Sequence, residues 1–286
     1  GVGLAISAPV SYDGEILNGS ILPTWCGTNI ADVFSEQLGC PIHVENESHC
    51  GALAEMTWGA AVGETNFVLF KFDLGIGGAI VIDSTVQRGA HGYAAEFGHM
   101  SLDPRGPLCR CGNRGCLETF AGGFQLLRYA EQSLREPVSI EQFVERARNG
   151  DPGFARLVDD AAEMAGWGMG IAFTTLNPPL FIIAGKLAEV GASFIGGLER
   201  SFARHSVATP AEVIASLNLF SFRPGRPITD ETMDAAAAIA GQAALAIDNA
   251  RLYQQQKEFA DTMQRSLLPR SHPELPGLEL GDVYES

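Results

Sequence analysis

Three cysteines and one histidine crowd a short, polar part of the chain. Cys109, Cys111 and Cys116 fall within eight residues, and His99 precedes them. Thiolates and imidazole nitrogens suit tetrahedral zinc, and four protein ligands leave no coordination position open for chemistry. Glycines inside this stretch permit the tight turns that three converging thiolates need. The spacing therefore predicts one structural zinc site, with reduced, unliganded thiols as the alternative.

The remaining cysteines, Cys26, Cys40 and Cys50, are scattered along the chain, and we expect them to be ordinary buried residues. The apolar stretch 1–10 has no basic leader, so it does not look like an export signal. In a chain without such a signal, metal binding is a better explanation for clustered cysteines than disulfides. We therefore expect a cytoplasmic protein.

Composition narrows the classes of function. The chain has 286 residues, 46% of them hydrophobic, and a formal net charge of -15. A nucleic-acid surface needs clustered Lys and Arg, so we expect this chain itself to make no such contact. No apolar run reaches the ~20 residues of a membrane span. The sequence predicts a soluble globular protein that does not enter a membrane.

Short apolar runs alternate with helical patterns, which predicts an α/β core. We expect strands at 1–8, 41–44, 67–72, 79–82 and 180–184, and helices at 29–38, 50–61, 124–133, 140–148 and 154–175. The last helix contains Gly166, Gly168 and Gly170. Each glycine costs up to ~1 kcal/mol relative to Ala, so we expect close packing of this helix against another backbone.

The composition changes near residue 216, which predicts two parts, 1–216 and 217–286. In the second part we expect a long helix from about 231 to 268. Leu245, Leu252 and Phe259 recur every seven residues in it, a spacing typical of a coiled-coil seam. We therefore expect a homodimer, and the alternative is a plain amphipathic terminal helix.

The zinc stretch also carries a resemblance. Glu-Phe-Gly-His at 96–99, followed by Cys-x-Cys-Gly-x-x-Gly-Cys-Leu-Glu at 109–118, resembles the signature of the ROK family of repressors, open reading frames and kinases. The resemblance covers about residues 1–216. It implies an actin-like ATPase (ribonuclease H-like) fold, zinc at the four ligands named above, and a sugar as ligand. The family's first phosphate motif is expected to be missing from this chain.

The resemblance also implies site residues. The sugar-binding residues would be Asn46, Glu47, Glu96, His99 and Glu118, with His99 shared between zinc and sugar. Gly75, Gly77 and Gly78 resemble the second phosphate loop, and Gly185 resembles the adenosine segment, although Ala184 stands where Gly is usual. The alternatives are surface carboxylates at Glu96 and Glu118, and a simple hairpin turn at the glycines.

Glu47 is the residue that bears most on whether the site binds a sugar or also catalyses phosphoryl transfer. A sugar kinase needs a carboxylate to take the proton from the attacking hydroxyl, and the family's base is an Asp where this chain has Glu47. The extra methylene moves the carboxylate by roughly an ångström, which can cost about a hundredfold in rate. Binding should survive this change better, because Glu47 still accepts hydrogen bonds from hydroxyls.

Three functions follow. The first is a sugar-binding ROK domain that senses the effector of a transcriptional regulator, which would contact DNA only through a separate N-terminal domain. The second is a glucokinase-like, ATP-dependent hexose kinase, the one case in which ATP and Mg²⁺ are cofactors. The third takes the C-terminal part as its clue, because 218–253 resembles the end of a GAF domain and 264–278 resembles the start of a PP2C-like (SpoIIE-type) phosphatase. We favour the first function and expect no enzymatic activity from this chain.

Overall fold

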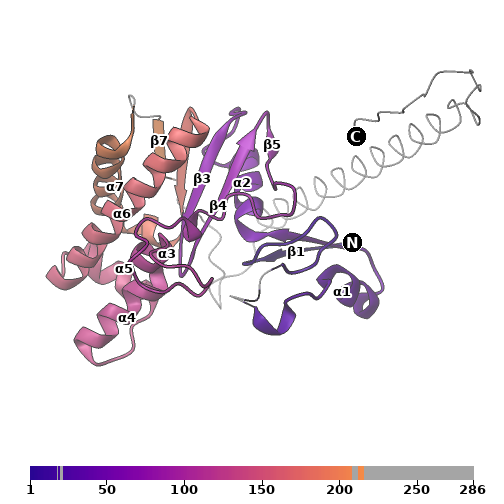
Figure 1. The fold of residues 1–286 in the computed structure, drawn as a ribbon, viewed down its shortest axis with the longest axis horizontal. Coiled ribbons are helices and arrows are strands. Elements are labelled where there is room, and N and C mark those ends of the chain that lie inside the picture. The colour runs from indigo at the N-terminus through magenta and orange to yellow at the C-terminus, as the bar shows by residue number, and fades with distance from the viewer. Residues whose placement is uncertain (18, 20–21, 208–211, 216–286) are drawn as a thin grey trace, which may run out of the picture. The chain divides into compact units, whose positions relative to one another are not determined.

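A five-stranded mixed sheet organises the fold (Figure 1). In spatial order its strands are β5 (Thr85–Val86), β4 (Ile76–Ile82), β3 (Phe67–Phe72), β6 (Leu180–Ala184) and β7 (Glu212–Ala215). Strand β3 runs antiparallel to β4 and parallel to β6, and β6 runs parallel to β7. The structure is a computed structural model that describes residues 1–17, 19, 22–207 and 212–215.

A second, smaller sheet pairs β1 (Val2–Ile6) in parallel with β2 (Ile42–Asn46). Helix α1 (Ile30–Leu38) lies between these strands in the sequence, and its Ile30 joins a small core with Ile16 and Val44. The side chain of Asn29 caps the start of α1, and Gly39 ends it in a left-handed conformation. Helix α2 (Glu47–Trp58) follows β2 without a connecting loop.

Helices cover both faces of the large sheet. On one face lie α3 (Glu118–Ala121), α4 (Gly123–Leu134), α5 (Ile140–Arg148), α6 (Pro152–Leu176) and α7 (Ala192–His205) (Figure 1). Short single-turn helices occupy Pro23–Trp25, Phe97–His99 and Lys186–Val190. Phe70 and Phe72 of β3 enter the core under α3 to α7, whereas Phe67 and Leu69 pack with Ala52 of α2 on the other face. This two-sided burial explains why the first four residues of β3, 67–70, are all apolar.

The glycines of α6 confirm the close packing that we expected. A Cβ atom at Gly166 would clash with the carbonyl oxygen of Leu198 in α7. A Cβ atom at Gly170 would lie 2.9 Å from the carbonyl oxygen of His205, at the end of α7. The missing side chains therefore let the backbones of α6 and α7 approach closely, which offsets the helix-propensity cost of glycine.

The predicted α/β class is confirmed, with differences at the edges of elements. Helix α2 begins three residues earlier than expected, because Asn46 caps it with hydrogen bonds to the backbone N–H groups of Ser48 and His49. Strand β4 begins at Ile76 and so includes two of the turn glycines. Helix α7 was not predicted, although it buries Phe194, Leu198 and Phe202 on one face.

The expectation that Cys26, Cys40 and Cys50 are buried is wrong. Cys26 is exposed, and Cys40 and Cys50 are only partly buried. Cys26 lies at the end of a single helical turn, where few side chains cover it.

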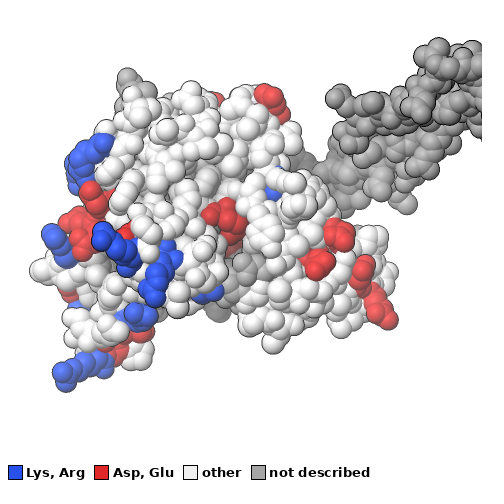
Figure 2. All heavy atoms as spheres, viewed as in Figure 1, with Lys and Arg blue, Asp and Glu red and all other residues white. Residues whose placement is uncertain are grey.

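On the face drawn in Figure 2, most Lys and Arg side chains gather over α4 to α7, away from β1 and α1. None of the described helices combines the length and apolar character needed to cross a bilayer.

The predicted coiled-coil helix at 231–268 lies outside the described residues. The same holds for the two segments that resemble a GAF domain and a phosphatase, 218–253 and 264–278. The described residues all belong to the compact unit Gly1–Thr229. The site that follows lies entirely within that unit.

Candidate functional site

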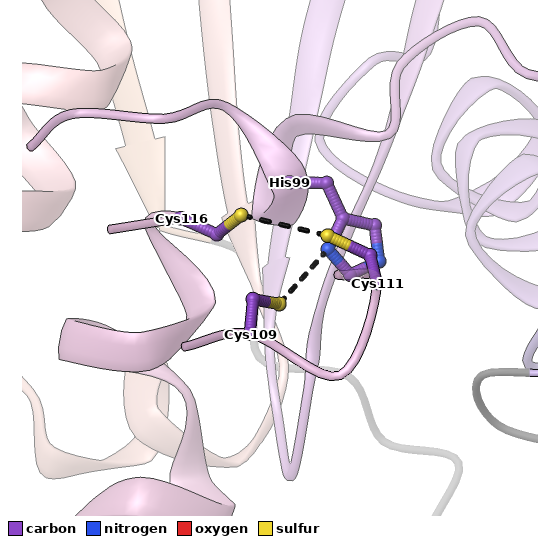
Figure 3. A group of neighbouring side chains, drawn as sticks. All are labelled: His99, Cys109, Cys111 and Cys116. Carbon is purple, nitrogen blue, oxygen red and sulfur yellow. Dashed lines mark hydrogen bonds between the residues drawn. The ribbon is translucent and has the colours of Figure 1, made fainter. Parts of the chain in front are cut away.

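The four predicted zinc ligands converge in space (Figure 3). Their donor atoms all lie within 4.8 Å of one another. The sulfur atoms of Cys111 and Cys116 are 3.6 Å apart, and Cys109 Sγ lies 3.6 Å from His99 Nδ1. Tetrahedral zinc with Zn–S and Zn–N bonds of ~2.3 and ~2.0 Å requires donor separations of about 3.5 to 3.8 Å. The donor set and its spacing therefore fit structural zinc.

Different elements supply these ligands. His99 ends the helical turn Phe97–His99, and Cys116 precedes α3. Cys109 and Cys111 come from a polar turn, in which Gly112 has a φ of 93° that glycine adopts without strain. Burial lowers the pKa of His99, which favours the neutral imidazole that metals bind. The polar, glycine-rich stretch therefore brings together four side chains whose donor atoms are compatible with a structural metal ion.

A pocket of about 380 Å³ lies beside this cluster. It gathers all five predicted sugar-binding residues, Asn46, Glu47, Glu96, His99 and Glu118, which come from well-separated parts of the sequence. The pocket opens where parallel strands end: Ser7 follows β1, Asn46 ends β2, and Asp73 follows β3. Ligands of open α/β folds commonly bind at the carboxyl ends of such strands.

Glu47 uses both of its carboxylate oxygens. Oε1 forms an ion pair with the Lys71 ammonium, and Oε2 accepts a hydrogen bond from the Ser7 hydroxyl. Burial alone would raise the pKa of Glu47, but the hydrogen bonds from Lys71 and Ser7 and the charge of Lys71 outweigh it and lower the pKa. Glu47 is therefore ionised at neutral pH and held in place.

Glu118 links three parts of the site. Its Oε2 atom accepts hydrogen bonds from the backbone N–H of Ile76 at 3.1 Å and from the Arg110 guanidinium at 2.8 Å. Both contacts fall on Oε2, so Oε1 can accept a ligand hydroxyl.

Glu96 has a pKa raised to about 7. Burial is the largest cause, the charge of His49 lowers the pKa, and the charge of Glu118 raises it. Glu96 can thus donate or accept a hydrogen bond near neutral pH.

Asn46 has a structural task as well as a place in the pocket. Its Oδ1 caps α2, and its Nδ2 donates to the carbonyl oxygen of Ala8 at 3.0 Å. The amide thereby holds the loop after β1 against the start of α2. One N–H of the amide is left for a ligand, since a carboxamide has two donors.

Steric contacts alone require glycine in and after the turn between β3 and β4. A Cβ atom at Gly75 would lie 2.7 Å from Glu118 Oε2, and Cβ atoms at Gly77 and Gly78 would clash with Ser48 and Phe97. Gly75 and Gly77 line the pocket, whereas Gly78 and Gly185 are not among its lining residues. Gly185 has a φ of 93° and lies against the backbone of Phe72, at the ends of β6 and β3.

Sequence reasoning missed several residues that line the pocket. Ser7 and Lys71 contact Glu47, Arg110 contacts Glu118, and Asp73 and Phe124 lie at the pocket wall. Arg110 could have been found, because it stands between two zinc ligands of the motif. The others lie in ordinary-looking strand ends and helix starts, and only the packing of the two sheets brings them to the pocket.

Comparison with known proteins gives consistent results. The sequence model of the ROK family matches residues 1–248, past the boundary near 216 that the sequence suggested. A glucokinase from Streptomyces coelicolor is 30% identical over 213 residues, which cover 67% of each chain. A xylose repressor from Bacillus spizizenii is 29% identical over 191 residues, 66% of this chain and 49% of the repressor.

The solved structure of a ROK family glucokinase from Streptomyces griseus, in complex with glucose and AMPPNP, superposes with a TM-score of 0.70. The identity is 28%, and the match covers 75% of each chain. This likeness confirms the actin-like ATPase fold that the sequence predicted. No comparison supports the predicted likeness of 218–253 to a GAF domain or of 264–278 to a phosphatase.

Proposed function

This chain belongs to the ROK family, and we propose that it is a sugar-binding domain that senses the effector of a transcriptional regulator. A glucokinase and a xylose repressor are both among its relatives, so a monosaccharide ligand is the property that the two kinds of relative share. In such a regulator DNA contact belongs to a separate domain. The proposal includes structural zinc at His99, Cys109, Cys111 and Cys116.

The composition of the pocket wall supports a sugar. Glu47, Glu96 and Glu118 offer carboxyl oxygens, Asn46 offers an amide donor, and His99 lines the pocket while its Nδ1 faces Cys109. Sugar hydroxyls each need an acceptor or a donor, and carboxylates form stronger hydrogen bonds than neutral acceptors. The polar wall therefore suits a ligand with several neighbouring hydroxyl groups.

The hydrogen bonds already made by backbone N–H groups of the glycine turn favour sugar sensing over phosphoryl transfer, and this observation carries the proposal. A phosphate-binding loop presents free backbone N–H groups to phosphate oxygens. Here the N–H of Leu74 donates to the Asp73 carboxylate at 3.0 Å, and the N–H of Ile76 donates to Glu118 at 3.1 Å. Two donors of the turn thus already hold carboxylates, which would also repel a phosphate group.

The contacts of Glu47 point the same way. Its two oxygens are engaged by Lys71 and Ser7, which stabilise the ionised carboxylate and so make it a weaker acceptor for the proton of an attacking hydroxyl. Hydrogen bonding to a bound sugar needs no proton transfer, and each carboxylate oxygen has a second lone pair that can accept it. The site is thus better arranged for binding than for general base chemistry.

A hexose kinase remains the second candidate, and one observation favours it. The lowered pKa of Glu47 keeps its carboxylate in the deprotonated form that a general base needs. In that case ATP and Mg²⁺ would be cofactors, and Gly75, Gly77, Gly78 and Gly185 would contact the nucleotide. We place this function second because Asp73 and Glu118 occupy two donors of the turn.

Two assays on zinc-loaded protein distinguish the candidates. Calorimetric titration with glucose, xylose, mannose and N-acetylglucosamine should show saturable binding of at least one sugar. A coupled assay for ADP release with the same sugars and MgATP should show no steady turnover. Steady turnover would establish the kinase, and failure of every sugar to bind would overturn both functions.

A further inference from the structure

The pocket has an apolar end that a free monosaccharide does not require. Leu74 and Phe124 both line it, and these two residues are 36% and 59% exposed. Neighbouring exposed apolar side chains that line a binding pocket offer an apolar contact surface to a ligand. The five predicted sugar-binding groups supply the polar part of the same pocket.

This apolar end is held in place by the backbone. The N–H of Phe124 donates to the carbonyl oxygen of Leu74 at 2.9 Å, and the N–H of Gly123 donates to that of Asp73 at 2.8 Å. A Cβ atom at Gly123 would lie 2.7 Å from the Asp73 oxygen, so only glycine allows this approach. The start of α4 is therefore fixed to the turn after β3, and Leu74 and Phe124 form a preformed rim.

The volume of the pocket agrees with a ligand larger than one sugar ring. At about 380 Å³ it falls in the range of pockets that hold drug-sized ligands, roughly 300 to 1,000 Å³. A single pyranose bound by the polar wall has no apolar substituent that would need Leu74 and Phe124. A second ring joined to that pyranose would supply one.

We propose that the ligand is a glycoside, with its sugar unit on the polar wall and a second ring against Phe124 and Leu74. The inference rests on the proposed sugar-binding function and names its ligand class. An aromatic side chain attracts the C–H face of a sugar or the face of another ring, and ring pairs gain affinity beyond the area they bury. The second ring can be a further sugar or an aromatic group.

Paired ligands test the inference. Zinc-loaded wild-type protein is titrated calorimetrically with glucose and xylose, with the phenyl α- and β-glycosides of each, and with cellobiose and xylobiose. We expect at least one glycoside or disaccharide to bind about tenfold more tightly than its free sugar. Phe124→Ala should remove this gain, so that the glycoside and its free sugar bind with similar affinity.

Tyr129→Ala is the matched control, because Tyr129 is an exposed aromatic residue of the same helix and is not among the residues that line the pocket. It should keep the gain, and Phe124→Tyr should keep most of it. Binding of free sugars with no gain for any glycoside would overturn this inference alone. So would an equal loss for free sugar and glycoside in Phe124→Ala, whereas no binding of any compound would overturn the proposed function as well.

Discussion

Arg110 donates a hydrogen bond to Glu118 Oε2 at 2.8 Å, and this contact joins the metal loop to the pocket. Arg110 stands between the predicted zinc ligands Cys109 and Cys111, and Glu118 is a predicted acceptor for the sugar. His99 makes a second link, since it belongs to the ligand cluster and also lines the pocket. Metal binding and sugar binding should therefore depend on each other.

Loss of a zinc ligand should weaken both metal and sugar binding. In Cys111→Ser the thiolate is replaced by a weaker ligand, so we expect zinc affinity to fall by more than about a hundredfold and the melting temperature to drop. Metal content measured by plasma mass spectrometry and thermal unfolding give the readouts. Cys40→Ser, outside the cluster, should keep its zinc, and a Cys111→Ser protein with full zinc and unchanged melting would contradict the assignment.

Replacing Arg110 should weaken sugar binding and leave the zinc content unchanged. Arg110→Gln removes the cation that orients Glu118, and a charge-assisted hydrogen bond of this kind contributes about 1.5 kcal/mol, so sugar affinity should fall roughly tenfold. Zinc content should stay at one ion per chain. The control is Arg105→Gln, an exposed arginine of the same loop. An unchanged sugar affinity in Arg110→Gln would refute the link through Glu118.

The lowered pKa of Glu47 gives stability that acid removes. A carboxyl group whose pKa is lower in the folded state stabilises the fold above its unfolded pKa, and this contribution disappears as the pH falls through the folded value. The Glu47 side chain is 41% exposed, so we expect less than about 1 kcal/mol. Melting curves of wild type and Glu47→Gln should differ by a constant gap above about pH 5, and the gap should close at lower pH.

The exposed Glu64→Gln serves as the control for this comparison, and its melting curve should follow that of the wild type at every pH. A gap for Glu47→Gln that widens as the pH falls would have the wrong sign for a lowered pKa. It would show that the contacts with Lys71 and Ser7 do not stabilise the ionised carboxylate.

Close packing of α6 on α7 predicts a large effect from a small substitution. Gly166→Ala places a methyl group against the carbonyl oxygen of Leu198, which should destabilise the fold by about 1 to 3 kcal/mol. Gly153→Ala, in the first turn of the same helix, meets no atom closer than 3.6 Å and should be near neutral. Equal urea midpoints for the two variants would argue against the helix contact.

Local patterns made much of this molecule predictable. The convergence of His99 with the three cysteines follows from four residues of suitable metal-binding chemistry at short spacing. Helix 140–148 follows from its periodic apolar face and the cap at Ser139. Helix α7 was missed, because Gly196 and Gly197 interrupt a pattern whose burial depends on α6.

The contacts of Lys71 and Ser7 with Glu47 could not be predicted either. These residues lie far apart in the sequence and meet only when the two sheets come together. Motif reasoning places a residue in a site, but the partners that set its pKa and its orientation come from tertiary packing. The resemblance likewise suggested a phosphate loop, whereas only the structure reveals that carboxylates hold two of its donors.

One calorimetric experiment tests the central claim most directly. Glucose and xylose are titrated into the zinc-loaded chain, first alone and then with MgATP present. We predict saturable binding of a sugar with the same dissociation constant in both conditions, and no continuing heat from turnover after ATP is added. Absence of binding for both sugars, or steady heat release that requires both sugar and ATP, would contradict the claim that this pocket senses a sugar without phosphorylating it.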